Sequence, residues 1–96
     1  MTRPAIHSGQ HIADELEAMD MSASTLARDL GIPSNRITEI IRERREITAD
    51  TAIRLGIWSR TSPEFWMNLQ KNYELRPSEN EHGAEIRRSV TPRQAA

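Results

Sequence analysis

The chain has 96 residues, which is room for one small domain and a short tail. It contains no cysteine, and this excludes disulfides and thiolate metal sites. Its 13 Lys and Arg against 14 Asp and Glu give a net charge of −1, which excludes a protein that holds nucleic acid by overall charge alone. With no long apolar segment and no signal-like start, the sequence is typical of a soluble cytoplasmic protein that does not enter membranes.

The first predicted helix runs from about Ser8 or Gly9 to Met19, and its apolar face of Ile12, Leu16 and Met19 is expected in the core. From Gln10 to Asp20 there is no Lys or Arg, and the four acidic residues are Asp14, Glu15, Glu17 and Asp20. An acidic face of this kind is usually a solvated surface. It also suits a basic protein partner.

Residues 22–42 predict two short helices that meet at a tight turn. Ser22 is positioned to cap the earlier of these two helices, which is the second predicted helix of the chain. The apolar residues of this helix recur at helical spacing: Leu26, Ala27 and Leu30. Gly31 is expected to end the helix in a left-handed conformation, and Ile32 to fill the space between the two helices. This arrangement is a helix-turn-helix, which is typical of DNA-binding proteins.

The second of these helices is expected to begin near Ser34, because Pro33 has no N–H to lose at a helix start. At about 100° per residue, its core-facing stripe consists of Ile37, Ile40 and Ile41. The remaining surface carries the candidates for reading base edges: Ser34, Asn35, Arg36, Thr38 and Glu39. The candidates for phosphate contacts follow directly: Arg42, Arg44 and Arg45. The alternative interpretation is an ordinary solvated helix, but the cap, the turn glycine, the core stripe and the basic cluster all favour DNA.

A fourth helix is expected from a cap at Thr48 to about Trp58. Its predicted core residues are Ala52, Ile53 and Leu55. Ser62-Pro63-Glu64 is the start signal of a fifth helix, whose apolar and aromatic side chains fall within one arc: Phe65, Trp66, Leu69 and Tyr73. Such a stripe is more often core or a dimer seam than a ligand site.

The helical pattern stops at Arg76, so the expected fold is an all-α, five-helix domain over residues 1–75 with a mobile tail over residues 76–96. The tail is either an unstructured terminus or a functional segment that folds on a partner or is cut by a protease. Nothing in its sequence decides between the two.

Several segments resemble HigA-type (VapI-type) antitoxins of the XRE helix-turn-helix family, over about Thr2 to Leu75. The most specific is Thr61-Ser62-Pro63-Glu64-Phe65-Trp66-Met67-Asn68-Leu69-Gln70. The others are Arg3-Pro4-Ala5-Ile6-His7, Leu26-Ala27-Arg28, Pro33-Ser34-Asn35-Arg36-Ile37 and Ile47-Thr48-Ala49-Asp50-Thr51-Ala52. The resemblance implies a lambda-repressor-like domain. It also implies a homodimer that neutralises a RelE/ParE-like, mRNA-cleaving toxin and represses its own operon at an operator.

The resemblance also assigns residues. It places the recognition helix at Ser34 to Arg42 and adds Ser22 and Ser24 as phosphate contacts. For the dimer it suggests Trp66, Met67 and Tyr73. The charge asymmetry alone suggests the residues that would contact a basic toxin: Asp14, Glu15 and Glu17. The family often has Asn-Gly where this chain has Arg42-Glu43, a loss of about 1 kcal/mol if the helix still needs a left-handed cap there.

The sequence is also compatible with two other interpretations. The first is a stand-alone XRE-type regulator with no toxin partner. The second is an enzyme or metal protein, for which the only support is His7 and His11 at i, i+4 with Asp14 and Glu15 nearby. The sequence contains no His-Glu-x-x-His motif, nucleophile–base set or Gly-rich phosphate loop, so no catalytic residue, metal or cofactor is predicted. His7 is instead expected to hydrogen-bond a helix start and His11 to lie on the surface.

Overall fold

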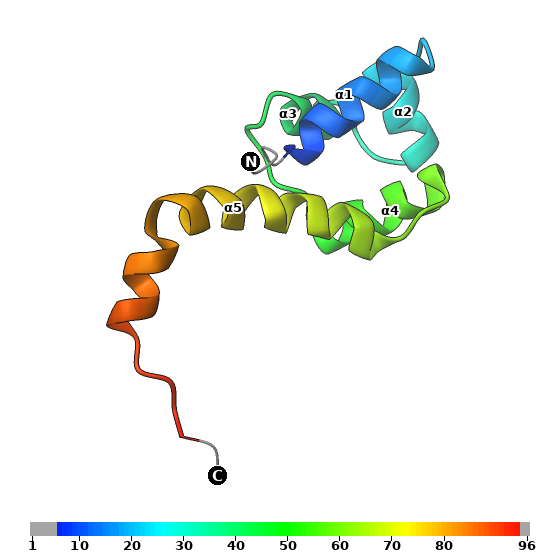
Figure 1. The fold of residues 1–96 in the computed structure, drawn as a ribbon. Helices are drawn as coiled ribbons and strands as arrows, with labels where there is room; N and C mark the ends of the chain where they lie inside the picture. Colours follow the sequence, from blue (N-terminus) through cyan, green and yellow to red (C-terminus); the bar gives the residue numbers. More distant parts are fainter. Residues whose placement is uncertain (1–5, 95–96) are drawn as a thin grey trace.

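A computed structural model describes residues 6–94. Within this range the chain has no strand and forms five helices: α1 (Ser8–Ala18), α2 (Ala23–Leu30), α3 (Ser34–Ile41), α4 (Ala49–Ser59) and α5 (Pro63–Ser89). Helices α1 to α3 gather beside α4 and the first half of α5, and the second half of α5 projects away from the domain (Figure 1). The predicted all-α class and the five helices are confirmed. Of the segments that resemble HigA antitoxins, Arg3-Pro4-Ala5 lies outside the described residues.

Side chains close the starts of four helices, as the sequence predicts. The capping residues are His7 for α1, Ser22 for α2, Thr48 for α4 and Ser62 for α5. Ser22 is representative, because its hydroxyl accepts the N–H of Thr25 at 3.1 Å and satisfies one of the donors that a helix start leaves unpaired. Helix α3 follows Pro33 and has no side-chain cap.

The first four helices end in the same way, with one residue in the left-handed conformation. These residues and their φ angles are Asp20 at 51°, Gly31 at 73°, Glu43 at 60° and Arg60 at 58°. The next N–H in each case donates to a carbonyl five residues back: Met21 to Leu16, Ile32 to Ala27, Arg44 to Glu39 and Thr61 to Gly56. This is the Schellman arrangement, and only at Gly31 is the left-handed position filled by the residue that adopts it without strain.

The core is one cluster of side chains from all five helices and the segment before α4. Its members are Ile12, Leu16, Leu26, Ala27, Leu30, Ile37, Ile40, Ile47, Ala52, Leu55 and Trp66. Trp66 is the largest, and its indole Nε1 donates to the hydroxyl of Ser59 at 3.1 Å, so its single polar atom is satisfied inside the domain. Helices α1 and α3 cross in close contact, because a Cβ added to Gly9 would overlap the backbone carbonyl of Ile40.

Two residues that the sequence assigns to the core lie at the surface instead. Ile53 is 50% exposed, because it sits one position around α4 from the buried Ala52 and therefore about 100° away from the core-facing side. Met19 is 52% exposed, because α1 ends at Ala18 and the chain turns before Met19 reaches the next position of the apolar face.

Helix α5 extends beyond the boundary that the sequence predicts. Its pattern stops at Arg76, yet the helix continues through Pro77 to Ser89. Apart from Gly83, the side chains of residues 77–89 are exposed, so this half of α5 lacks the buried stripe from which a helix is recognised in a sequence. The mobility of residues 76–96 stays a prediction.

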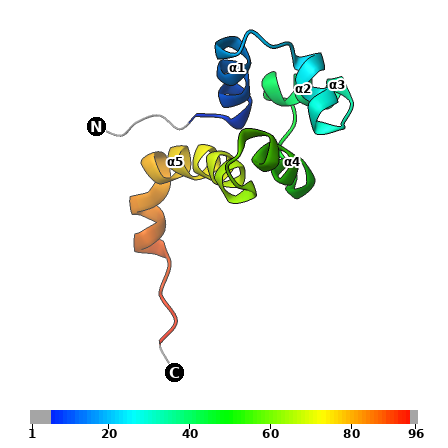
Figure 2. The same ribbon diagram turned by 90° about the vertical axis from the view of Figure 1, so that its right-hand side faces the viewer.

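Pro77 explains the shape of α5. A proline inside a helix lacks the N–H of the helical ladder and crowds the carbonyl four residues earlier, which here is that of Tyr73. Figure 2 shows that α5 bends about halfway along its length and turns away from the domain. None of the helices formed by residues 6–94 combines the length and the apolarity needed to cross a bilayer.

Candidate nucleic-acid interface

The predicted helix-turn-helix is present as α2, the Gly31 turn and α3. Ile37 and Ile40 are fully buried and Ile41 is partly buried, so the narrow core stripe of α3 is confirmed. The rest of α3 faces outward. Ser34 and Asn35 are exposed, and Thr38 and Glu39 are half-exposed.

The polar side of α3 is available to a ligand. Asn35 and Glu39 are four residues apart and therefore lie one above the other on the same side of the helix. Neither side chain bonds to another residue within 6–94, whereas the hydroxyl of Thr38 donates to the carbonyl of Asn35 at 3.1 Å. The Thr38 methyl group and the Asn35 amide remain free to meet base edges.

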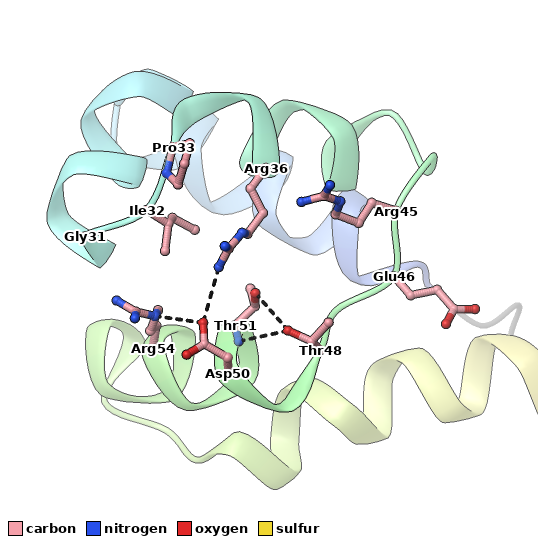
Figure 3. Close-up of a pocket in the computed structure, with 10 residues that line it drawn as sticks. All are labelled: Gly31, Ile32, Pro33, Arg36, Arg45, Glu46, Thr48, Asp50, Thr51 and Arg54. Carbon is pink, nitrogen blue, oxygen red and sulfur yellow. Dashed lines mark hydrogen bonds and ion pairs between the residues drawn. The ribbon is translucent and has the colours of Figure 1, made fainter.

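Arg36 is the exception among the five base-reading candidates. Its Nη1 donates to Oδ2 of Asp50, in the first turn of α4, at 3.2 Å. The same oxygen accepts Nε of Arg54 at 2.9 Å, and Nη1 of Arg54 donates to the carbonyl of Leu30 at 2.8 Å. Figure 3 shows both arginines directed at Asp50, Arg36 from α3 above it and Arg54 from beside it on α4. We call these residues the Arg36–Asp50–Arg54 network.

The network sets the charge state of its carboxylate. The hydrogen bond from Arg54 and the positive charges of Arg54 and Arg36 hold the pKa of Asp50 below the ordinary 3.8, against the smaller opposing effect of desolvation. Asp50 is therefore ionised throughout the neutral range. Sequence reasoning treated it only as an acidic residue in a first turn, because nothing local links it to a residue fourteen positions earlier.

A hollow of about 490 Å³ lies between the start of α3 and the start of α4. Its lining residues are Gly31, Ile32, Pro33, Arg36, Arg45, Glu46, Thr48, Asp50, Thr51 and Arg54. In Figure 3 the side chain of Glu46 points away from the hollow. Arg45 forms no hydrogen bond or ion pair with the described residues, so its cation is free to bind an anion.

The loop after α3 carries the predicted phosphate contacts, and α5 holds it in place. The N–H of Ile47 donates to Oε1 of Gln70 at 2.5 Å, and Nε2 of Gln70 donates to the carbonyl of Ile47 at 3.2 Å. Arg42, Arg44 and Arg45 are exposed on this loop. Sequence reasoning missed Gln70 as a functional residue. The available signal in the sequence was the position of Gln70 four residues after Trp66, which places this polar side chain on the core-facing side of α5.

The two serines assigned to phosphate differ in what they bond. The hydroxyl of Ser22 caps α2 and also lies 3.0 Å from the Thr25 hydroxyl. Ser24 is exposed and forms no such bond among the described residues. Both lie at the start of α2, where backbone N–H groups favour anions.

The acidic residues of α1 are accessible. Asp14 and Glu17 are exposed and Glu15 is half-exposed. Asp14 accepts a hydrogen bond from the amide of Gln10 at 2.9 Å, and Glu15 lies 3.4 Å from Nε2 of His11. None of the three forms an ion pair with a described Lys or Arg.

The two histidines have structural contacts. Nδ1 of His7 accepts the N–H of Gly9 at 2.8 Å, which confirms the predicted hydrogen bond at the start of α1. His11 was expected on the surface, and this is wrong: it is half-buried, with ring centroids 5.4 Å from Phe65 and 5.2 Å from Trp66. Its ring lies against α5 through these two edge-to-face contacts. Residues 6–94 contain no group of three or more His, Cys, Asp or Glu placed to hold a metal ion.

One of the three residues suggested for the dimer is corrected by the structure. Trp66 is 0% exposed, so its side chain lies inside the domain and is not available to a second copy. Met67 is partly buried against the core. Tyr73 is exposed, and its ring makes an edge-to-face contact with that of His7, with ring centroids 4.8 Å apart. Of the three residues, only Met67 and Tyr73 are accessible to a second copy.

Comparison with known proteins identifies the family. No family profile matches the chain. It is 43% identical over 79 residues to virulence-associated protein I of Dichelobacter nodosus, a match that covers 81% of this chain and 73% of that protein. The structure is similar to an addiction module antidote protein of the HigA family from Coxiella burnetii, with a TM-score of 0.82, 47% identity and 96% and 100% of the two chains covered.

A second solved structure is that of the Pseudomonas aeruginosa antitoxin HigA with the higBA promoter. The TM-score is 0.78 and the identity is 42%, over 96% of this chain and 100% of that one. These matches extend through the helix-turn-helix and α5 alike. The chain therefore belongs to the HigA family of antitoxins.

Proposed function

We propose that this chain is the antitoxin of a type II, HigBA-like toxin–antitoxin system. It binds and neutralises a RelE/ParE-like, mRNA-cleaving toxin and represses its own operon by sequence-specific DNA binding. Both duties are binding rather than catalysis, and both place its activity in the cytoplasm, where the operon and the mRNA are found. The observation that carries the proposal is the exposed polar side of α3 within a complete helix-turn-helix.

For DNA, α3 enters the major groove and the surrounding basic residues contact the backbone. Bases are read by Ser34, Asn35, Thr38 and Glu39, since amide, hydroxyl and carboxylate groups match the donors and acceptors of base edges. Phosphates are bound by Ser22, Ser24, Arg42, Arg44 and Arg45. The promoter-bound HigA from Pseudomonas aeruginosa, with its TM-score of 0.78, supports this assignment.

The operator-binding form is a homodimer. One chain has a single recognition helix, and two copies related by a two-fold axis present their helices about 34–36 Å apart, to successive faces of the major groove. The operator is therefore an inverted repeat with half-sites about one turn apart. Met67 and Tyr73, at the surface of α5, are the proposed dimer contacts of the described chain.

For the toxin, the proposed contact is the acidic surface of α1. An enzyme that cleaves mRNA presents a basic surface to its substrate, and Asp14, Glu15 and Glu17 supply the complementary charge. No described Lys or Arg forms an ion pair with these acids, which supports their availability to a partner.

The test is co-expression of the tagged chain with the neighbouring small open reading frame, followed by pulldown and a growth assay. We expect a stable complex and restored growth. In the same assay, Asp14→Lys/Glu17→Lys should weaken rescue while operator binding is unchanged, so the DNA interaction serves as the internal control. Neither complex nor rescue, with operator binding intact, would instead establish the alternative of a stand-alone XRE-type regulator.

A further inference from the structure

The Arg36–Asp50–Arg54 network links α2, α3 and α4, which together we call the DNA-binding unit. Arg36 comes from α3, Asp50 and Arg54 come from α4, and the Leu30 carbonyl that Arg54 binds is at the end of α2. That carbonyl has no helical partner of its own, so the bond from Arg54 satisfies it. Asp50 thus accepts hydrogen bonds from both arginines of the network.

We propose that Asp50 is a positioning residue for operator recognition. It holds the Arg36 guanidinium against α4, away from the base edges, and thereby fixes the first turn of α3 relative to the rest of the unit. The inference rests on the proposed DNA-binding function and changes the role of Arg36 from a base-reading candidate to a link between helices.

The position of Arg36 on α3 supports this role. Arg36 precedes the buried Ile37 by one residue and so points to the flank of the helix, whereas Asn35 and Glu39 lie roughly opposite Ile37. Arg36 is also half-buried, in contrast to the exposed Asn35 next to it. Its direction toward α4 is visible in Figure 3, where a dashed line joins it to Asp50.

The first turn of α3 has few other attachments. Helix α3 is only eight residues long, Pro33 provides no side-chain cap, and the first fully buried residue of the helix is Ile37, at its fourth position. Hydrogen bonds to bases require side chains to be held within about 0.5 Å of the correct geometry. The Arg36–Asp50 pair supplies a polar attachment at the end of α3 that carries Ser34 and Asn35.

The experiment compares Asp50→Asn with wild type on two DNA duplexes: one selected from random sequence by the wild-type protein, and a scrambled duplex of equal length. The variant keeps the shape of the side chain and removes its charge. We expect the ratio of affinities for the selected and scrambled duplexes to fall about three- to tenfold, while binding to the scrambled duplex stays level or rises because a negative charge is lost. Asp50→Glu should restore most of the ratio.

A matched control separates positioning from overall charge. Asp29→Asn makes the same charge change at an exposed residue of α2 that has no bonding partner among the described residues, and it should shift both affinities equally. Arg36→Met keeps the apolar stem and removes the guanidinium. Under the proposal it lowers the ratio as Asp50→Asn does, leaves the preferred base at every position unchanged, and adds little when the two are combined.

Two results would overturn the positioning role: equal effects of Asp50→Asn and Asp29→Asn on both duplexes, or a loss of base preference at one position in Arg36→Met. The second would make Arg36 a base reader after all. If the wild-type protein selects no consensus duplex, the proposed DNA-binding function fails, and the role of Asp50 fails with it.

Discussion

Gln70 in α5 pairs with both backbone polar groups of Ile47, twenty-three residues earlier in the chain. The two bonds resemble the pair of N–H···O hydrogen bonds that two residues exchange between neighbouring antiparallel β-strands, with the side-chain amide of Gln70 in place of the second strand. They join α5 to the loop that carries Arg44 and Arg45. The helix that closes the core therefore also positions the residues proposed to bind phosphate.

Replacing Gln70 by Met tests this link, since methionine has a similar length and no amide. We expect the free energy of unfolding to fall by about 1–3 kcal/mol, because the N–H and carbonyl of Ile47 lose their partners in a partly buried place. Urea denaturation measures the change, and Asn68→Ala, at an exposed position of the same helix, is the control. DNA affinity should fall for all sequences alike. A normal affinity would show that the loop does not depend on Gln70.

Glu43→Gly should stabilise the protein. Glu43 has a φ of 60°, a conformation that costs a residue with a Cβ about 1 kcal/mol and that glycine adopts freely. The matched control is Arg42→Gly: Arg42 has a φ of −80°, so glycine there should destabilise by about 0.5–1 kcal/mol. Opposite signs in denaturation experiments would confirm that the strain belongs to position 43. Equal losses at both positions would contradict it.

Asn35→Ala should remove the readout of one base. A bidentate side-chain contact to a base is worth about 1–3 kcal/mol of discrimination, so selection from random duplexes should show a flattened preference at one position of each half-site. The remaining positions should be unaffected, which is the internal control. An unchanged sequence preference would rule out Asn35 as a reader.

Arg44→Ala should act without regard to sequence. Its loss removes one phosphate contact, so affinity should fall for every duplex and the dependence of log K on log salt should lessen by about one per affected subunit. Titrations at several salt concentrations measure the slope, and Arg88→Ala, in the exposed half of α5 that projects from the domain, is the comparison. A change in preference at one base would mean that Arg44 reads sequence.

The pH dependence of stability should reveal Asp50. Its pKa is lower in the folded protein than the ordinary 3.8, so its ion pairs add stability above the unfolded value, and this contribution is lost as the pH falls through the folded value. The difference in unfolding free energy between wild type and Asp50→Asn should be constant at neutral pH, begin to decrease near the unfolded pKa of 3.8, and vanish only below the lower pKa of the folded protein. Because the carboxylate is largely exposed, the difference should also shrink at high salt. If the difference in unfolding free energy persisted in acid, it would come from the asparagine side chain and not from the lost charge of Asp50.

The starts of the helices and most of the core were predictable from the sequence, because each depends on residues a few positions apart. Ser22, Thr48 and Ser62 cap the helices that follow them, and Gly31 ends α2 as its conformational freedom predicts. The spacing of Ile37 and Ile40 likewise identified the buried side of α3. From these local signals followed the helix-turn-helix, and with it the proposed DNA-binding surface.

Other features depended on contacts between distant parts of the chain. Arg36 and Asp50 are fourteen residues apart, and only the placement of α4 opposite α3 in the fold turns a base-reading candidate into half of an ion pair. Trp66 could have been core or dimer seam, and the packing of the first half of α5 against α4 and α1 buries its side chain in the core. The sequence by itself determined where helices begin and which sides are apolar, since backbone hydrogen bonds and helical period are local. The tertiary structure alone decided which polar side chains meet, since those distances follow from how the helices pack.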